Sequence, residues 1–188
     1  MVGIDLSNFS GIVTGGAGGI GKAIVIKLLE AGADVVIADI NEKEGEKTIE
    51  ELKEFKNKIE FIKTDVSKKY EVENLVKKTL ERFKKIDYLV NNAGILIPRL
   101  LVDPEGKEEI TEEIFDRMVS INQKGYLLCA QSVARQMIRN KKGVIVNMAS
   151  ESALEGSEGQ SVYAATKAAI YSFTRSWAKE LGKYNIRV

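Results

Sequence analysis

The chain has 188 residues, with 28 basic and 27 acidic side chains, and 44% of its residues are hydrophobic. This composition predicts one globular domain over residues 1–188. A formal net charge of +1 excludes a strongly basic surface, so we expect no nucleic-acid partner. No apolar run reaches the roughly 18 residues of a membrane span, so we expect no membrane partner.

The residue types that are scarce or absent also limit the chemistry. The single cysteine, Cys129, excludes an internal disulfide framework, and the N-terminus lacks the pattern of a secretory signal, so we expect a cytoplasmic protein. Without histidine, Ser–His–Asp and Cys–His nucleophile systems are excluded, and we expect no metal site. Any general acid or base must be Asp, Glu, Lys, Tyr or Cys.

Short β-branched segments alternate with longer helical patterns along the chain. The predicted strands are 11–14, 34–39, 59–65, 86–92 and 143–150. The predicted helices are 20–31, 42–56, 68–84, 111–139 and 160–183, and residues 184–188 begin a sixth strand. This alternation predicts an α/β fold of three layers, in which helices cover both faces of a parallel sheet with right-handed crossovers.

A glycine-rich turn, "TGGAGGIG", links the first predicted strand to the first predicted helix at Thr14–Gly21. Glycines at such a turn let the backbone approach a pyrophosphate closely, and the helix start offers free N–H groups to the phosphates. Glycine pairs alone would also fit a flexible loop. The position between a strand and a helix favours a dinucleotide site in a doubly wound, Rossmann-type sheet.

Asp39 ends the second predicted strand, 18 residues after Gly21. A carboxylate at this distance can accept hydrogen bonds from both hydroxyls of the adenosine ribose and would repel a 2′-phosphate. The next residues, Ile40 and Asn41, offer no arginine to such a phosphate. This pattern favours NAD over NADP, although a solvated aspartate at a strand end is the simpler alternative.

Further polar segments end other strands. Asp65 and Val66 follow the third strand, "NNAG" at 91–94 follows the fourth, and Ser150 closes the fifth. Each alone would read as ordinary turn chemistry. Because an open parallel sheet binds its ligand at the carboxyl ends of its strands, we expect them to form one rim.

Tyr163 and Lys167 are four residues apart in "SVYAATKAA" and therefore share one helix face. A free tyrosine, with a pKa near 10, is a poor base at neutral pH. A nearby ammonium and an oxidised nicotinamide both favour the phenolate, so the pair could replace the missing histidine. An isolated YxxxK pattern is more often a half-buried aromatic beside a solvated lysine; the absence of histidine and the upstream Ser150 favour catalysis.

Taken together in this order, these motifs, with Asn122 in "INQKG" and Ser150 thirteen residues before "YAATK", resemble the short-chain dehydrogenase/reductase family over essentially the whole chain. The resemblance implies four catalytic residues. Tyr163 would be the acid/base, and Lys167 would lower the pKa of the tyrosine and bind the nicotinamide ribose. Ser150 would stabilise the reacting oxygen, and Asn122 would support the proton relay. It implies an NAD site made by Gly15, Gly19, Ile20, Gly21, Asp39, Asp65, Val66, Asn92, Ala93 and Gly94, with Tyr163 and Lys167.

Within the family, several segments resemble the subgroup that acts on sorbitol 6-phosphate. Glu151, Glu155 and Ser157 could meet sugar hydroxyls, beside Ser150, and Arg99 could meet a phosphate or simply be a solvated loop residue. We therefore expect an enzyme that oxidises a secondary alcohol, such as a sugar alcohol or its phosphate, with NAD. The alternatives are a reductase of another carbonyl, such as a diketone or ketoacyl thioester, and a non-catalytic NAD-binding module.

The resemblance carries two further expectations. Family members continue beyond "NIRV" into the rest of strand six, a segment that covers the substrate and a last strand. We therefore expect 1–188 to be an incomplete Rossmann domain that is unstable or weakly active alone. Wide apolar stripes on helices 111–139 and 160–183 could pack in the core or against another subunit, and the resemblance implies a homodimer or homotetramer.

Overall fold

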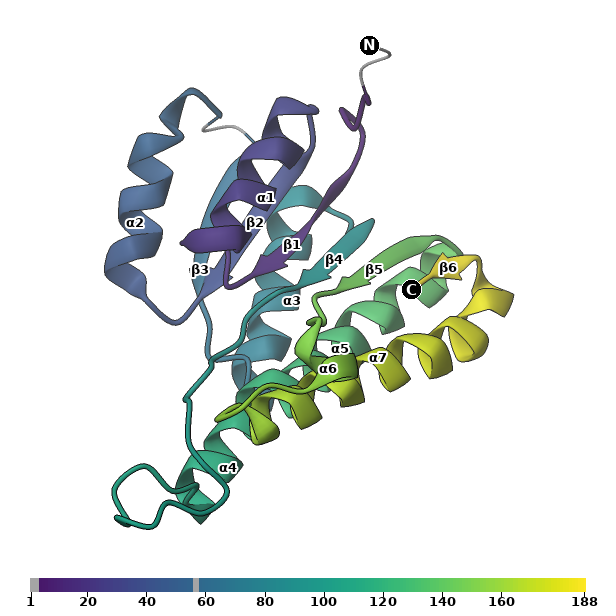
Figure 1. Ribbon diagram of the computed structural model, residues 1–188. Helices are drawn as coiled ribbons and strands as arrows, with labels where there is room; N and C mark the ends of the chain where they lie inside the picture. The colour runs from purple at the N-terminus through teal and green to yellow at the C-terminus, as the bar shows by residue number, and fades with distance from the viewer. Residues whose placement is uncertain (1–3, 56–57) are drawn as a thin grey trace.

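A six-stranded parallel sheet forms the centre of the computed structural model, which describes residues 4–55 and 58–188 (Figure 1). The spatial order of the strands is β3-β2-β1-β4-β5-β6. Their bounds are β1 Ser10–Thr14, β2 Asp34–Asp39, β3 Ile59–Lys63, β4 Tyr88–Asn91, β5 Gly143–Asn147 and β6 Ile186–Arg187. The predicted parallel sheet is confirmed, and this order is that of a Rossmann-type fold.

Helices connect the strands and cover both faces of the sheet, which confirms the three predicted layers (Figure 1). The long helices are α1 Gly19–Glu30, α2 Glu42–Glu51, α3 Lys69–Phe83, α4 Glu112–Val119, α5 Gly125–Asn140 and α7 Ser161–Leu181. The shorter ones are α6 Ser152–Glu155, two 3₁₀ turns at Lys53–Phe55 and Gly182–Tyr184, and a π-helical turn at Ser120–Lys124.

Two apolar clusters, one on each face, explain why the strands read as continuous hydrophobic runs. Val13, Val35 and Ile37 point to one face and pack with residues of α1 and α2. The alternate residues of the same strands, such as Ile12 and Val36, join a second cluster with residues of α3 and α5. A strand buried on both faces needs apolar residues at consecutive positions, as Ile12 and Val13 of β1 and residues 35–38 of β2 show.

The structure corrects several predicted boundaries. The predicted helix 111–139 is α4, the π-helical turn and α5 in succession, and the predicted strand 143–150 ends at Asn147 because the chain leaves the sheet there. The predicted helix 42–56 ends as α2 at Glu51, followed by a 3₁₀ turn; its last residue lies outside the described residues. The predicted sixth strand is present as β6.

The strand order reverses between β1 and β4, which are neighbours in space but are separated by two β–α units in sequence. The connections from β1 and β4 therefore leave toward opposite faces and open a crevice at the carboxyl ends of these strands. In the part of the chain that the structure describes, no helix has the length and apolarity needed to cross a lipid bilayer.

The contact between β1 and β4 yields a test of the fold. A Cβ added at Gly11 would lie 2.2 Å from the backbone oxygen of Tyr88 in β4, so Gly11→Ala must force these strands apart. We expect a loss of about 1–3 kcal/mol or more in the free energy of unfolding, measured by urea denaturation. Gly182→Ala is the control, because that position has a helical φ of −56° and open space around it. Equal stability of both variants would contradict the tight β1–β4 contact.

Candidate active site

The glycine-rich turn between β1 and α1 has a backbone that larger residues would not tolerate. Gly15 has a φ of +65° and Gly19 a φ of +50°, a region that favours glycine. A Cβ on Gly21 would lie only 2.0 Å from the carbonyl oxygen of Gly15. The glycines therefore permit this turn and bring its backbone close to whatever occupies the crevice.

The start of α1 offers free backbone donors toward the same crevice. Gly18 is the N-cap residue, and it has no side chain that could accept a hydrogen bond from the first turn. The first turn also contains no acidic residue. Unpaired N–H groups and the helix dipole at such an end favour a phosphate group.

Thr14 and Asn92 join the carboxyl ends of β1 and β4. The Thr14 hydroxyl accepts hydrogen bonds from the backbone N–H groups of Asn92 (3.0 Å) and Ala93 (3.1 Å). The Asn92 amide donates in return to the carbonyls of Thr14 (3.0 Å) and Gly15 (3.2 Å). Sequence analysis named Asn92 as a cofactor residue and gave Thr14 no such role; the structure shows that the two fix the floor of the crevice together.

Asp39 lies at the end of β2 beside the glycine-rich turn. One carboxylate oxygen accepts a hydrogen bond from the Ala17 N–H (3.1 Å), and the other accepts one from the Asn41 N–H (3.0 Å). These bonds fix the carboxylate at the crevice and leave it lone pairs for further donors. The position is the one that a ribose-binding acid requires.

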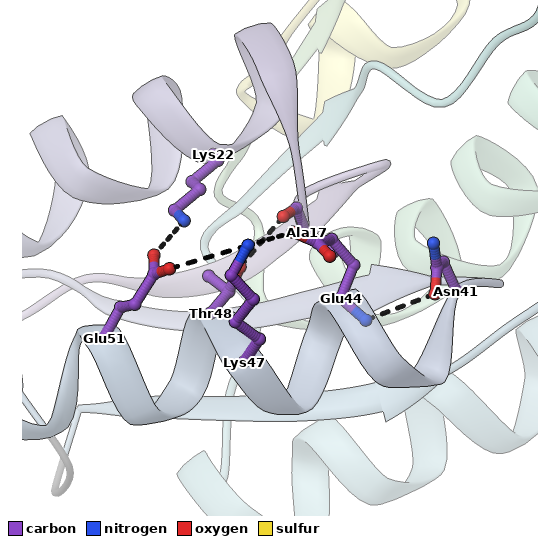
Figure 2. Close-up of polar contacts among 7 residues, drawn as sticks. All are labelled: Ala17, Lys22, Asn41, Glu44, Lys47, Thr48 and Glu51. Carbon is purple, nitrogen blue, oxygen red and sulfur yellow. Dashed lines mark hydrogen bonds and ion pairs between the residues drawn. The ribbon is translucent and has the colours of Figure 1, made fainter.

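Helix α2 supports the glycine-rich turn from below, as Figure 2 shows. The buried hydroxyl of Thr48 donates to the carbonyl of Ala17 (2.9 Å). Lys22 of α1 forms an ion pair with Glu51 of α2. Asn41 caps α2 by accepting a hydrogen bond from the Glu44 N–H (3.2 Å). The turn is therefore held in shape by side chains that do not face the crevice.

The crevice has a volume of about 450 Å³. It is lined by Gly15, Gly18, Ile20, Gly21, Ala38, Asp39, Ile40, Thr64, Asp65, Val66, Asn92, Ala93, Gly94, Ile95 and Ile121. Nine of the twelve predicted cofactor residues are in this set. Gly19 shapes the turn, and Tyr163 and Lys167 lie on α7 outside this set. The sequence did not assign the other six lining residues to the cofactor; each lies within or next to a strand end or a predicted motif: Gly18, Ala38, Ile40, Thr64, Ile95 and Ile121. Glycine backbone, free N–H groups and a fixed carboxylate fit a dinucleotide.

Asn122 lies in the π-helical turn and is fully buried. Its side-chain amide accepts from the Ile95 N–H (2.8 Å), and donates to the Ile95 carbonyl (2.8 Å) and the Thr166 hydroxyl (3.2 Å). The side chain thus ties the loop after β4 to α7. π-Turns inside helices are frequent at functional sites, and this one directs Asn122 inward. The predicted relay role of Asn122 stays a prediction.

Lys167 is buried, with 4% of its surface exposed, and lies on α7 one turn after Tyr163. Its ammonium donates to the Met148 carbonyl (2.6 Å) and to the Tyr126 hydroxyl (3.1 Å). The ammonium is also 5.8 Å from the centre of the Tyr163 ring. Burial lowers the pKa of Lys167 to about 8. The predicted pair is therefore brought together, and its cation is held by the chain segment that follows β5.

Ser150 lies two residues after Met148, at the start of the segment that leads into α6. Its hydroxyl is hydrogen-bonded to the Ser152 hydroxyl at 2.9 Å, and α6 packs against α7. Ser150 therefore follows directly on the carbonyl that binds Lys167. Glu151 and Glu155, predicted to meet substrate, are exposed at the two ends of this segment.

Arg99 lies in the loop after β4, in a setting that the sequence did not predict. Its guanidinium forms an ion pair with Glu108 at 2.7 Å, and its backbone N–H donates to the Gly159 carbonyl at 2.8 Å. The loop 98–110 is thus attached to the segment 150–160. These two segments together are called the rim. A phosphate would have to compete with Glu108 for Arg99.

Comparison with known proteins assigns this arrangement. The profile of the short chain dehydrogenase family matches residues 11–188. The chain belongs to the short chain dehydrogenase family. This confirms the family resemblance found in the sequence, and the Rossmann-type sheet is the fold that it implied.

Individual members of the short chain dehydrogenase family differ in their substrates. The chain is 53% identical over 180 residues to a sorbitol-6-phosphate 2-dehydrogenase of Klebsiella pneumoniae, covering 94% of this chain and 65% of that protein. It is 44% identical over 177 residues to a 3-oxoacyl-acyl-carrier-protein reductase, FabG, of Chlamydia pneumoniae, covering 94% and 69%. The crystal structure of gox2181 matches with a TM-score of 0.90 at 35% identity, covering 98% and 71%. The chain thus spans slightly less than two thirds of the length of the first relative.

The burial of Lys167 makes stability depend on pH. Its pKa is about 8 in the folded protein and about 10.4 in an unfolded chain, so between these values the unfolded chain binds more protons. Stability must therefore rise with pH across this window. Between pH 7 and 10.5, the free energy of unfolding of the wild type should rise by roughly 2–3 kcal/mol relative to that of Lys167→Met, measured by urea denaturation.

The matched control for this titration is Lys179→Met, which removes an exposed lysine from the same helix. The difference in free energy of unfolding between the wild type and Lys179→Met should not rise with pH as it does for Lys167→Met. Parallel stability curves for the wild type and Lys167→Met would mean that the Lys167 ammonium is not buried as described.

Proposed function

We propose that this protein is an NAD-dependent oxidoreductase that oxidises a secondary alcohol and reduces the corresponding ketone. The observation that carries the proposal is the buried Lys167 ammonium beside Tyr163, near a crevice with the features of a dinucleotide site. Membership of the short chain dehydrogenase family supports it. A simple nucleotide-binding module would have no use for a buried cation next to a phenol.

Different residues of the crevice would bind the pyrophosphate, the ribose and the adenine of the cofactor. The glycine-rich turn and the start of α1 would bind the pyrophosphate, and Asp39 would accept hydrogen bonds from the adenosine ribose. Asp65 and Val66 line the crevice beyond β3, where they would border the adenine. Bound there, the oxidised nicotinamide supplies the acceptor for the hydride that leaves the alcohol carbon.

The chain's own residues handle the proton. The Tyr163 phenolate would accept the proton of the substrate hydroxyl, and the nearby Lys167 cation stabilises that phenolate electrostatically. The Ser150 hydroxyl would donate a hydrogen bond to the reacting oxygen and hold it in place. In the reverse direction Tyr163 returns the proton to the ketone oxygen, so protons balance in both directions.

We propose a sugar alcohol or its phosphate, such as sorbitol 6-phosphate, as the substrate. The 53% identity to a sorbitol-6-phosphate 2-dehydrogenase supports this class, and so does the polar rim that carries Glu151, Glu155 and Arg99. A ketoacyl thioester is the second candidate, because a FabG reductase is 44% identical. In solution we propose a cytoplasmic homo-oligomer, since half-buried Trp177 and partly exposed Leu127 line a hollow of about 230 Å³ between α5 and α7.

Removal of the phenol oxygen tests the catalytic assignment. Tyr163→Phe should lower turnover at least about a thousandfold, because the proposed mechanism assigns the proton to the Tyr163 phenol. Binding of NAD, measured by calorimetry, should stay within about threefold of wild type. Tyr171→Phe, a partly exposed tyrosine on the same helix, is the matched control and should keep full activity. Substantial turnover by Tyr163→Phe would remove the proposed role.

Asp39→Asn tests the cofactor preference. The amide keeps the size of the side chain and removes the negative charge that would repel a 2′-phosphate. The ratio of kcat/KM for NADP to that for NAD should rise about tenfold, which corresponds to about 1.4 kcal/mol. Asp34→Asn, at the opposite end of β2, is the control and should leave the ratio unchanged. A wild-type protein that prefers NADP would refute the assignment of Asp39.

A turnover screen separates the two substrate classes. Sugar alcohols, their 6-phosphates and a ketoacyl thioester should be compared with NAD and NADH on the full protein. We expect the highest kcat/KM for a phosphorylated sugar alcohol. If the thioester is the better substrate, the polyol assignment fails while the catalytic assignment stands.

A further inference from the structure

Two polar groups from different elements meet at the Lys167 ammonium. Lys167 donates to the Met148 carbonyl (2.6 Å) and to the Tyr126 hydroxyl (3.1 Å), and the Tyr126 hydroxyl also donates to the Met148 carbonyl (3.2 Å). Tyr126 lies on α5 and is 1% exposed. The three atoms therefore form a closed, buried triangle that joins α5, α7 and the end of β5.

The donor count of the ammonium shows what the triangle leaves free. A lysine ammonium has three N–H donors, and Met148 and Tyr126 take two of them. Because the Tyr126 hydroxyl hydrogen points to the Met148 carbonyl, its lone pairs face the ammonium. One N–H of the ammonium remains, which would serve the cofactor ribose and Tyr163.

We propose that Tyr126 is a positioning residue of the reaction: its hydroxyl holds the Lys167 ammonium in a fixed place and orientation next to Tyr163. The inference rests on the proposed function, in which that ammonium serves Tyr163. Tyr126 itself transfers no proton. It aims the third N–H and supplies a dipole that favours the charged form of the lysine.

The electrostatic surroundings make this dipole important. Among the described residues Lys167 has no carboxylate partner, and the titratable groups that face it are Tyr126 of α5 and Tyr163 of α7. Burial raises the pKa of Tyr126, and burial raises the pKa of Cys129, the next titratable group on α5, to about 12. Tyr126 and Cys129 are therefore neutral in the working range, and the two hydrogen-bond partners of the buried charge are neutral dipoles.

Water would not replace a lost hydroxyl here. Removing one oxygen from a buried ring leaves a space smaller than a water molecule needs. The ammonium of Tyr126→Phe would keep the Met148 carbonyl and lose its second acceptor. Tyr88→Phe is a matched control: Tyr88 is also buried, and its hydroxyl donates to the Asp34 carbonyl (2.7 Å) at the opposite end of the sheet.

The experiment is a pH titration of the full protein, with lysine labelled at Cε and Nζ, by NMR. The Lys167 resonance is assigned with Lys167→Met. In the wild type its pKa, lowered by burial, should be about 8. In Tyr126→Phe it should fall by about one unit because the charged form loses an acceptor, and in Tyr88→Phe it should not move. An equal pKa in wild type and Tyr126→Phe would overturn the proposal.

Kinetics provide the second readout. In Tyr126→Phe, kcat at pH 8 should fall about tenfold, the pH profile of kcat should shift with the NMR titration, and KM for the alcohol should stay within about twofold. A uniform loss at every pH, matched by Tyr88→Phe, would mark a structural effect and overturn the proposal. If the wild type shows no turnover, the proposed function fails and the NMR result still decides the role of Tyr126.

A measurement on the unmodified protein covers the case in which Tyr126→Phe does not fold. With tyrosine labelled at Cζ, the Tyr126 resonance should change at the pH at which Lys167 loses its proton, although Tyr126 stays neutral. A Tyr126 resonance that does not respond at that pH would contradict the contact.

Discussion

The site depends on burying one lysine charge, that of Lys167, which forms no ion pair with a carboxylate of residues 4–55 or 58–188. A buried ammonium is costly, and a nearby carboxylate would compensate it but would also cancel its effect on a phenolate. Here the compensation comes from the Met148 carbonyl and the Tyr126 hydroxyl, which are neutral dipoles. In the proposed mechanism the cation therefore remains available to Tyr163, at the cost of a pKa lowered to about 8.

The same contacts explain how the fold aligns two otherwise separate parts of the site. The crevice is built at the ends of β1, β2 and β4, whereas Lys167 and Tyr163 are on α7. Met148 follows β5, the neighbour of β4, so its bond to Lys167 places α7 relative to the sheet. Asn122 makes the second connection, from the loop after β4 to Thr166 of α7. The position of the tyrosine relative to the crevice is therefore set by side-chain hydrogen bonds as well as by core packing.

The sequence predicted the elements that follow a repeating pattern, but it did not predict features that depend on one local irregularity or one contact. The strands were predictable because the centres of β1 and β2 are runs of consecutive apolar residues. The glycine-rich turn was predictable because its glycines directly follow a strand. The π-helical turn around Asn122 could not be predicted, because one extra residue in a helical turn leaves no periodic signal. The role of Tyr126 was hidden because a buried tyrosine has the same pattern as any core aromatic. The partner of Arg99 depends on a loop whose path no local pattern fixes.

The separation of rim and catalytic core bears on how substrates are chosen in this family. The residues that we propose to bind the cofactor and move the proton lie on strand ends and long helices, whereas the rim consists of the loop 98–110 and the segment 150–160. The two rim segments are joined by the bond from the Arg99 N–H to the Gly159 carbonyl. Two relatives that are 53% and 44% identical to this chain carry names that give different substrates. The ion pair of Arg99 with Glu108 fits this view, because an arginine already held in place can select an anionic group only if that group displaces the carboxylate. Specificity for a phosphorylated substrate would then be decided by that exchange at the rim and not by the Tyr163–Lys167 pair.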